Sequence, residues 1–206
     1  MKLNVRSALV RQFSRPTGVL GRLVGLIMAT RPSNLERNMR TLAQVDIQPD
    51  DRILEIGFGP GIAIERAAEL AKRGKVIGVD HSELMLRQAS RRNATAIAAG
   101  RVDLRLGTAE RLPEFSEPFD KVIAINSYLF WNDPEGVLLG LRNRMKSGAV
   151  IALTFQSRKR DATNEDTQRG AEAIAASLQR AGFENVRSET FMIKPVNAAC
   201  VLGEAP

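Results

Sequence analysis

A short apolar run followed by three closely spaced glycines is the segment of this 206-residue chain with the clearest chemistry. The run Arg52–Ile56 has the aliphatic residues of a buried strand, and Gly57, Gly59 and Gly61 follow it directly. Glycines at such a turn let the backbone bend sharply and approach a ligand without interference from a Cβ atom. A helix after the turn would point free N–H groups at that ligand. The segment predicts a nucleotide-type site between a strand and a helix.

The spacing of the glycines excludes two common nucleotide sites. A dinucleotide-binding turn would carry its third glycine where this chain has Ile62, so the pyrophosphate motif of hydride-transfer enzymes is missing. No Gly-Lys-Ser or Gly-Lys-Thr follows the turn, which excludes a Walker-type phosphate loop.

The elements that must position this turn alternate regularly from residue 46 onward. Short β-branched runs and longer helical segments follow one another, which predicts βα units and a mostly parallel sheet. The expected strands are Arg52–Ile56, Lys75–Asp80, Val102–Gly107, Phe119–Asn126, Ala149–Phe155, Asn185–Ile193 and Asn197–Leu202. The last two are expected to be antiparallel to each other, because only a tight connection joins them. The expected helices begin near Gly61, Ser82 and Pro134, and another runs from Glu165 to Arg180. Asp133 is the expected N-cap of the helix that begins at Pro134.

Glu55, one apolar residue and the glycine triplet resemble the first motif of class I S-adenosylmethionine-dependent methyltransferases. Asp80 ends the next strand, where that family places an acidic side chain on the ribose hydroxyls. The segment Leu106–Pro113 resembles the family's adenine-contacting segment, although Thr108 stands where many members carry Asp. The resemblance extends over residues 50–205 through Phe119-Asp120, Asn126 and Ala181-Gly182-Phe183.

The resemblance implies both a fold and a cofactor. The implied fold is a Rossmann-like α/β class I methyltransferase fold, with a mostly parallel seven-stranded sheet, an antiparallel C-terminal strand and preceding N-terminal helices. The implied cofactor is S-adenosylmethionine, with Glu55 at its methionine amino end, Asp80 on the ribose, and His81 and Met85 beside adenine. The full set of implied cofactor residues is Glu55, Gly57, Gly59, Gly61, Asp80, His81, Met85, Thr108, Ala109 and Asn126.

Some of these residues also have a purely structural interpretation. Glu55 could be a strand-end carboxylate satisfied within the protein. A histidine directly after a strand, such as His81, often caps the next helix, and a methionine such as Met85 is often a core residue.

The acceptor is expected beside the cofactor, because ligands of open α/β sheets bind outside the carboxyl ends of the strands. Tyr128 is the candidate substrate-facing side chain, either orienting an acceptor or forming a pocket wall, and Trp131 is expected to be structural. The stretch 126–131 lacks the Asn/Asp-Pro-Pro-aromatic motif of family members that methylate exocyclic base amines. Arg158, Lys159 and Arg160 either contact an anionic acceptor or form a solvated charge run.

No catalytic base is assigned from the sequence. His81 is the single histidine, and the resemblance places it beside adenine. We therefore expect methyl transfer to a small-molecule acceptor mainly by proximity and desolvation, with an amine, thiolate, carbon acid or acidic phenol as the nucleophile. An Asp, Glu or Tyr base is the alternative that the sequence leaves open.

Charge divides the chain at residue 45. Residues 1–45 hold eight basic side chains and one acidic one, a local charge of +7, whereas the remainder is neutral. Two short helices are expected within residues 5–28. We interpret residues 1–45 as a basic helical arm or lid and residues 46–206 as the S-adenosylmethionine-binding domain. One alternative is a lipid methyltransferase whose arm contacts an anionic membrane surface. Another is that the arm is a solvated basic extension that improves solubility.

The overall composition limits the remaining possibilities. Aromatic residues make up 5% of the chain, and no basic tract is interleaved with them, so a nucleic-acid-associated or non-catalytic cofactor-binding protein is the least favoured alternative. The single cysteine, Cys200, and single histidine exclude Cys-rich and multi-His metal sites, so no metal is expected. A cytoplasmic location is expected, which the lipid-methyltransferase alternative would make peripheral to a membrane. The oligomeric state is left open.

Overall fold

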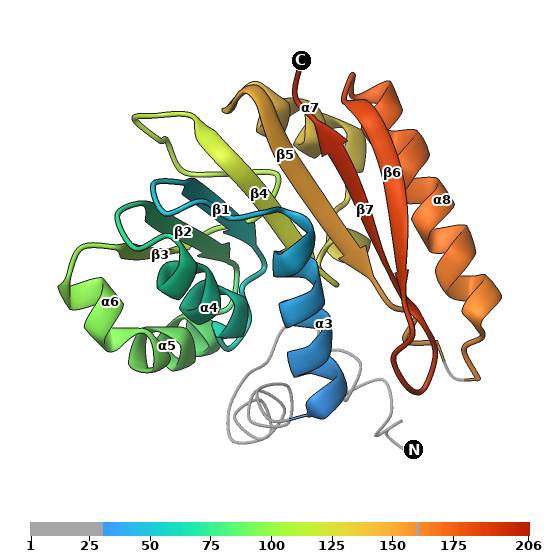
Figure 1. Ribbon diagram of the computed structural model, residues 1–206, viewed down its shortest axis with the longest axis horizontal. Coiled ribbons are helices and arrows are strands. Elements are labelled where there is room, and N and C mark those ends of the chain that lie inside the picture. Colours follow the sequence, from blue (N-terminus) through green and yellow to red (C-terminus); the bar gives the residue numbers. More distant parts are fainter. Residues whose placement is uncertain (1–30, 160) are drawn as a thin grey trace, which may run out of the picture.

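A seven-stranded sheet organises the part of the chain that the computed structural model describes, residues 31–159 and 161–206. The strand order is β3-β2-β1-β4-β5-β7-β6 (Figure 1). All neighbouring strands among β1, β2, β3, β4 and β5 are parallel to each other, and β7 is antiparallel to both β5 and β6. This topology confirms the predicted fold. The two helices expected within residues 5–28 lie outside the described residues.

The strands begin and end close to their predicted positions. They are β1 (Arg52–Ile56), β2 (Lys75–Asp80), β3 (Val102–Leu106), β4 (Phe119–Ile125), β5 (Met145–Phe155), β6 (Glu184–Phe191) and β7 (Ala198–Glu204). The start of β5 differs most, because it pairs from Met145 rather than from Ala149. Exposed residues and the left-handed Gly148 (φ +73°) interrupt the apolar pattern there, so the pattern does not predict the first part of the strand.

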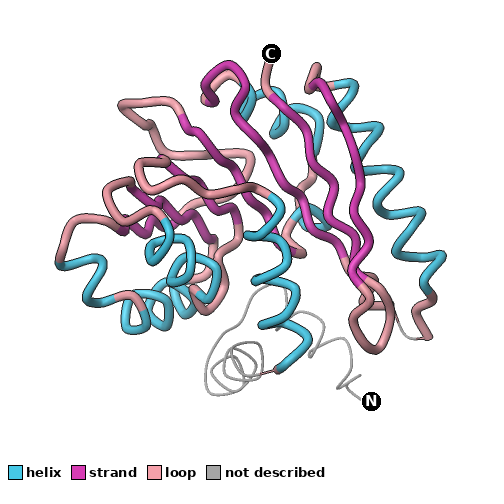
Figure 2. Tube along the Cα trace, viewed as in Figure 1, coloured by secondary structure: helices cyan, strands magenta, loops and turns pink. Residues whose placement is uncertain are grey.

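The helices lie between the strands and before β1 (Figure 2). They are α3 (Pro32–Gln44), α4 (Ile62–Leu70), α5 (Glu83–Arg92), α6 (Ala94–Ala98), the 3-10 turn η1 (Tyr128–Phe130), α7 (Pro134–Arg142) and α8 (Asn164–Arg180). Asp133 caps α7 as predicted, by accepting a hydrogen bond from the N–H of Gly136 at 3.0 Å. Within the described ranges, no helix combines the length and apolar character that crossing a membrane requires.

The helices cover both faces of the sheet. Figure 1 shows α3, α4 and α5 on one face and α7 and α8 on the other. Leu42 and Ile64 belong to the core beneath the first group, and Leu138 and Leu178 to the core beneath the second. This arrangement leaves the carboxyl ends of the parallel strands accessible at one edge, where α3 lies.

Helix α3 packs against the sheet domain, although its residues belong to the predicted N-terminal arm. The hydroxyls of Thr41 and Thr154 share a hydrogen bond, with their oxygens 2.6 Å apart, which joins α3 to β5. Leu42 and Val45 are buried in the core. Residues 32–44 therefore form one side of the domain at the edge where the strands end.

Candidate functional site

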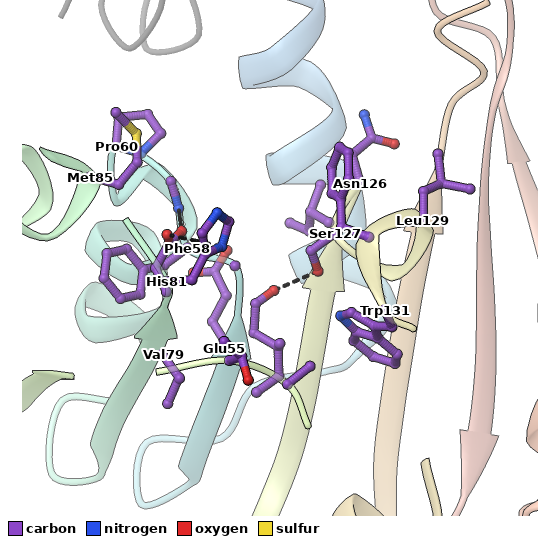
Figure 3. A pocket seen from close by; sticks show the side chains of 18 of the residues that line it. Glu55, Phe58, Pro60, Val79, His81, Met85, Asn126, Ser127, Leu129 and Trp131 are labelled. Carbon is purple, nitrogen blue, oxygen red and sulfur yellow. Dashed lines mark hydrogen bonds and ion pairs between the residues drawn. The ribbon is translucent and has the colours of Figure 1, made fainter. Parts of the chain in front are cut away.

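A pocket of about 570 Å³ opens over the carboxyl ends of the parallel strands. Figure 3 shows two groups of side chains facing each other across it: Glu55, Phe58, Pro60, Val79, His81 and Met85 on one side, and Asn126, Ser127, Leu129 and Trp131 on the other. Following the expectations from the sequence, we call the side formed by the ends of β1, β2 and β3 the nucleoside half. The side formed by the ends of β4 and β5 and by α3 is called the acceptor half on the same basis.

The turn after β1 lies at the boundary between the two halves. Gly57 has φ +77°, and a Cβ atom on it would lie 2.5 Å from the Cβ of Ser127, so only glycine fits. The Ser127 hydroxyl donates a hydrogen bond to the carbonyl of Ile56 at 2.7 Å. Gly57 and Gly59 both line the pocket.

Gly61 departs from the prediction that all three glycines approach the ligand. It is not among the residues that line the pocket. Its φ is +80°, and a Cβ atom on it would lie 2.7 Å from the Cβ of Ala89 and 2.8 Å from Nδ2 of Asn93. Glycine is needed here because α4 packs closely against α5, a long-range contact that the glycine spacing does not reveal.

This interpretation predicts a larger loss of stability for Gly61→Ala than for Gly100→Ala. Both glycines have left-handed φ, at +80° and +72°, but a Cβ atom on Gly100 would meet nothing within 4 Å. Gly100→Ala should therefore cost only the conformational term of about 1–2 kcal/mol. Gly61→Ala should cost about 1–3 kcal/mol more, because α4 and α5 must shift. Urea unfolding of both variants measures the difference, and equal losses would contradict the packing role.

Two buried carboxyl groups lie at the ends of β1 and β2. Asp80 accepts hydrogen bonds from the N–H groups of Gly59 at 2.9 Å and Ser82 at 2.8 Å. Glu55 is 2% exposed, and its Oε2 has no hydrogen-bond partner among the described residues. Burial, followed by the charge of Asp80, raises the pKa of Glu55 to about 8. Burial also raises the pKa of Asp80, although the N–H groups of Ser82 and Gly59 oppose that shift. A ligand that brings hydrogen-bond donors or positive charge would satisfy this pair.

The remaining predicted residues of the nucleoside half line the same pocket, namely His81, Met85, Thr108 and Ala109. His81 lies beside Asp80, with Nδ1 3.9 Å from Oδ1. Met85 is also a core residue, at 2% exposure, so its two interpretations are compatible. Glu110 belongs to the predicted adenine-contacting segment but was not selected individually; it lines the pocket and accepts a hydrogen bond from the N–H of Asn132 at 2.9 Å. That hydrogen bond lowers the pKa of Glu110.

In the acceptor half, Asn126 is held in the left-handed conformation, with φ 56°. Its Oδ1 accepts a hydrogen bond from the N–H of Gln156 at 2.8 Å, and its buried Nδ2 has no partner among the described residues. Asn126 therefore presents an unused donor at the boundary with the nucleoside half. Trp131 is 8% exposed and lines the pocket, so it is both a structural residue and a wall.

Tyr128 does not occupy its predicted substrate-facing position. It is absent from the pocket lining, and its hydroxyl donates to Oγ of Ser177 in α8 at 3.0 Å. Its ring packs against Trp131, with centroids 5.2 Å apart. The 3-10 turn η1 directs this side chain toward the core beneath α7 and α8. The neighbouring Leu129 and Phe130 line the pocket instead.

Four polar residues of the acceptor half were not selected as site residues from the sequence. Asn34, Arg37 and Asn38 reach the pocket from α3, and Arg158 reaches it from the loop after β5. The available signal was their spacing, since positions three and four residues apart share one face of a helix. For Arg158 the sequence left two roles open, contact with an anionic acceptor or membership of a solvated charge run, and the structure places it in the pocket lining.

Comparison with known proteins agrees with this geometry. Residues 53–148 match a family profile described as a methyltransferase domain. The chain is 34% identical over 184 residues to the uncharacterized methyltransferase YdaC of Bacillus subtilis, covering 89% of this chain and 98% of that protein. It is 30% identical over 148 residues to trans-aconitate 2-methyltransferase of Variovorax paradoxus, covering 71% of this chain and 51% of that protein. A crystal structure of a SAM-dependent methyltransferase from Aquifex aeolicus shares the fold, with a TM-score of 0.69 at 18% identity over 85% of this chain and 94% of that one.

Proposed function

This chain belongs to the class I S-adenosylmethionine-dependent methyltransferases, and from that premise we propose that it methylates a small molecule bound in the acceptor half of the pocket. The pocket volume of about 570 Å³ is within the range of small-molecule sites. The similarity to an enzyme named for trans-aconitate also supports a small acceptor. The lipid and nucleic-acid alternatives gain no support from the described residues.

The observation that carries the proposal is the buried pair Glu55 and Asp80 at the edge of the pocket. The unpartnered Oε2 of Glu55 suits the methionine amino group of the cofactor. The Asp80 carboxylate keeps lone pairs for the two ribose hydroxyls while Gly59 and Ser82 fix its position. We assign His81 and Met85, with Thr108 and Ala109, to the adenine. When bound, S-adenosylmethionine supplies a methyl group that its sulfonium already activates.

The residues of the acceptor half orient the acceptor and exclude water from it. Leu129, Phe130 and Trp131 form an apolar wall. Nδ2 of Asn126, a residue predicted from the sequence to bind the cofactor, offers a hydrogen-bond donor where the two halves meet. His81, the chain's single histidine, lies at the end of β2 in the nucleoside half. We therefore propose that transfer depends on proximity and desolvation and not on a dedicated base. Helix α3, the described part of the basic arm, forms one side of the acceptor half, which supports the interpretation of the arm as a lid.

The test combines binding with transfer. Calorimetry should show S-adenosylmethionine and S-adenosylhomocysteine binding at micromolar concentrations, on the order of 1–100 μM. Incubation with methyl-labelled S-adenosylmethionine and a panel of small amines, thiols, phenols and carboxylic acids should label a small molecule, and excess S-adenosylhomocysteine should suppress the labelling. Absence of binding, or preferential labelling of RNA, DNA or lipid vesicles, would contradict the proposal.

A further inference from the structure

A buried arginine in the acceptor half has only uncharged hydrogen-bond partners in the described part of the chain. Arg37 is 3% exposed; it donates to Oε1 of Gln156 at 2.6 Å and to Oδ1 of Asn34 at 2.7 Å. Its Nε is buried without a hydrogen-bond partner among the described residues. Arg40 on the same helix, by contrast, forms an exposed ion pair with Glu36 at 2.7 Å.

A buried guanidinium without a counter-ion is energetically unfavourable, because burial removes its hydration and no opposite charge replaces it. Further positive charges surround Arg37. Burial, followed by the charges of Arg158 and Arg31, lowers the pKa of Arg37 to about 9. Arg37 and Arg158 both line the pocket, although they come from α3 and from the loop after β5.

The two halves of one pocket therefore contain different titratable groups. The carboxyl groups of Glu55 and Asp80 lie in the nucleoside half, whereas the two arginines lie in the acceptor half. We propose that Arg37 and Arg158 bind a carboxylate or phosphate group of the methyl acceptor. This inference rests on the proposed function and narrows the acceptor to an anion. The planar guanidinium group favours both kinds of anion, because its donors match their paired oxygens.

The same half of the pocket also defines the rest of the acceptor. Leu129 and Phe130 line it and remain 52% and 49% exposed, and Trp131 lies beside them. Apolar side chains exposed at the rim of a pocket indicate a partly apolar ligand. The acceptor is therefore an organic anion with an apolar part.

The test uses protein saturated with S-adenosylhomocysteine and the fluorescence of Trp131, the chain's single tryptophan. Hexanoate, its uncharged analogue hexanamide and inorganic phosphate are each titrated into the protein in separate experiments at constant ionic strength. Hexanoate should bind about tenfold or more tightly than hexanamide. Arg158→Gln and Arg37→Gln should each remove that preference. If neither anion binds, or if the variants keep the preference, the proposal is overturned.

Matched variants exclude a general effect of charge. Lys159→Gln removes the neighbouring charge, which pairs with Asp166 at 3.2 Å, and Arg40→Gln removes an exposed charge of α3. Both should keep the preference for hexanoate. Because Arg37 is buried, Arg37→Lys is made as well, and thermal unfolding identifies any variant that fails to fold. Arg158→Gln keeps the test decisive if every Arg37 variant unfolds.

The methionine carboxylate of the cofactor is the competing anion, and a separate comparison distinguishes it. If Arg37 or Arg158 bound that carboxylate, replacing the arginine would lower the affinity for S-adenosylhomocysteine. The affinity for 5′-methylthioadenosine, which lacks the amino-acid part, would not change. That result would overturn the anionic-acceptor proposal and leave the proposed function intact. If wild-type protein binds neither nucleoside, the proposed function itself fails. We expect the affinity of both nucleosides to change by less than about twofold in Arg158→Gln.

Discussion

Replacing Asp80 by Ala is expected to weaken S-adenosylmethionine binding about tenfold or more. The variant loses a carboxylate that accepts from Gly59 and Ser82 and still has lone pairs for ribose hydroxyls. A hydrogen bond to a charged group contributes about 1.5–3 kcal/mol, which corresponds to roughly 10- to 150-fold in affinity. Calorimetry at fixed pH and salt measures the change.

Two companion variants identify the cause of that loss. Asp103→Ala removes a carboxylate of β3 that pairs with Arg105 at 2.7 Å and does not line the pocket, so affinity should stay within about twofold. Asp80→Asn keeps the shape and one accepting oxygen, and its affinity should be intermediate. Unchanged affinity in a folded Asp80→Ala protein would disprove the assignment of Asp80 to the ribose.

Glu55→Gln is expected to flatten the pH dependence of stability of the ligand-free protein. The pKa of Glu55 is raised from 4.5 to about 8 in the folded chain, so the native state holds a proton that the unfolded state releases. Stability should therefore fall as pH rises between these values, by about 1.4 kcal/mol per pH unit for one such group. Glutamine carries no such proton, so the variant should be more stable than wild type near pH 8 and similar to it near pH 4.5.

Urea unfolding between pH 5 and pH 8 tests this expectation. Asp80 also contributes to the wild-type slope, because burial raises its pKa, so the difference between wild type and variant is the relevant quantity. Glu69→Gln is the control, since that carboxylate is exposed and pairs with Arg66 at 2.6 Å. Parallel stability curves for wild type and Glu55→Gln would show that Glu55 is not protonated in the native state.

The residues that were predictable from the sequence are those whose role is local. Glu55 and Asp80 each end a short apolar strand, and parallel strands bring such ends to one edge of the sheet. Asp133 and Pro134 mark the start of α7 by capping chemistry alone. The strand order required the resemblance to a known family, because strand patterns do not encode which strands are neighbours.

The residues whose roles were not predicted correctly depend on partners that are distant in the sequence. Gly61 is needed because of Ala89 in the next helix, and Tyr128 is directed away from the pocket by Ser177 in α8. Arg37 is buried, although arginine is usually found at the surface. Apolar periodicity cannot predict that the polar face of a helix will line a pocket. Such assignments become possible only when the tertiary neighbours are known.

The hydrogen bond between Ser127 and Ile56 has a consequence for how precisely methyl transfer can be aligned. It joins the ends of β1 and β4 where the nucleoside and acceptor halves meet, and Gly57 packs against the same serine. The relative orientation of the two binding half-sites is thus preorganised when the chain folds, before either ligand arrives. Misplacement by about 1 Å can slow a reaction about 100-fold, so a loosened junction would lower turnover while both ligands still bound normally. We therefore infer that Ser127 aligns the two half-sites and that a binding assay would not detect its loss.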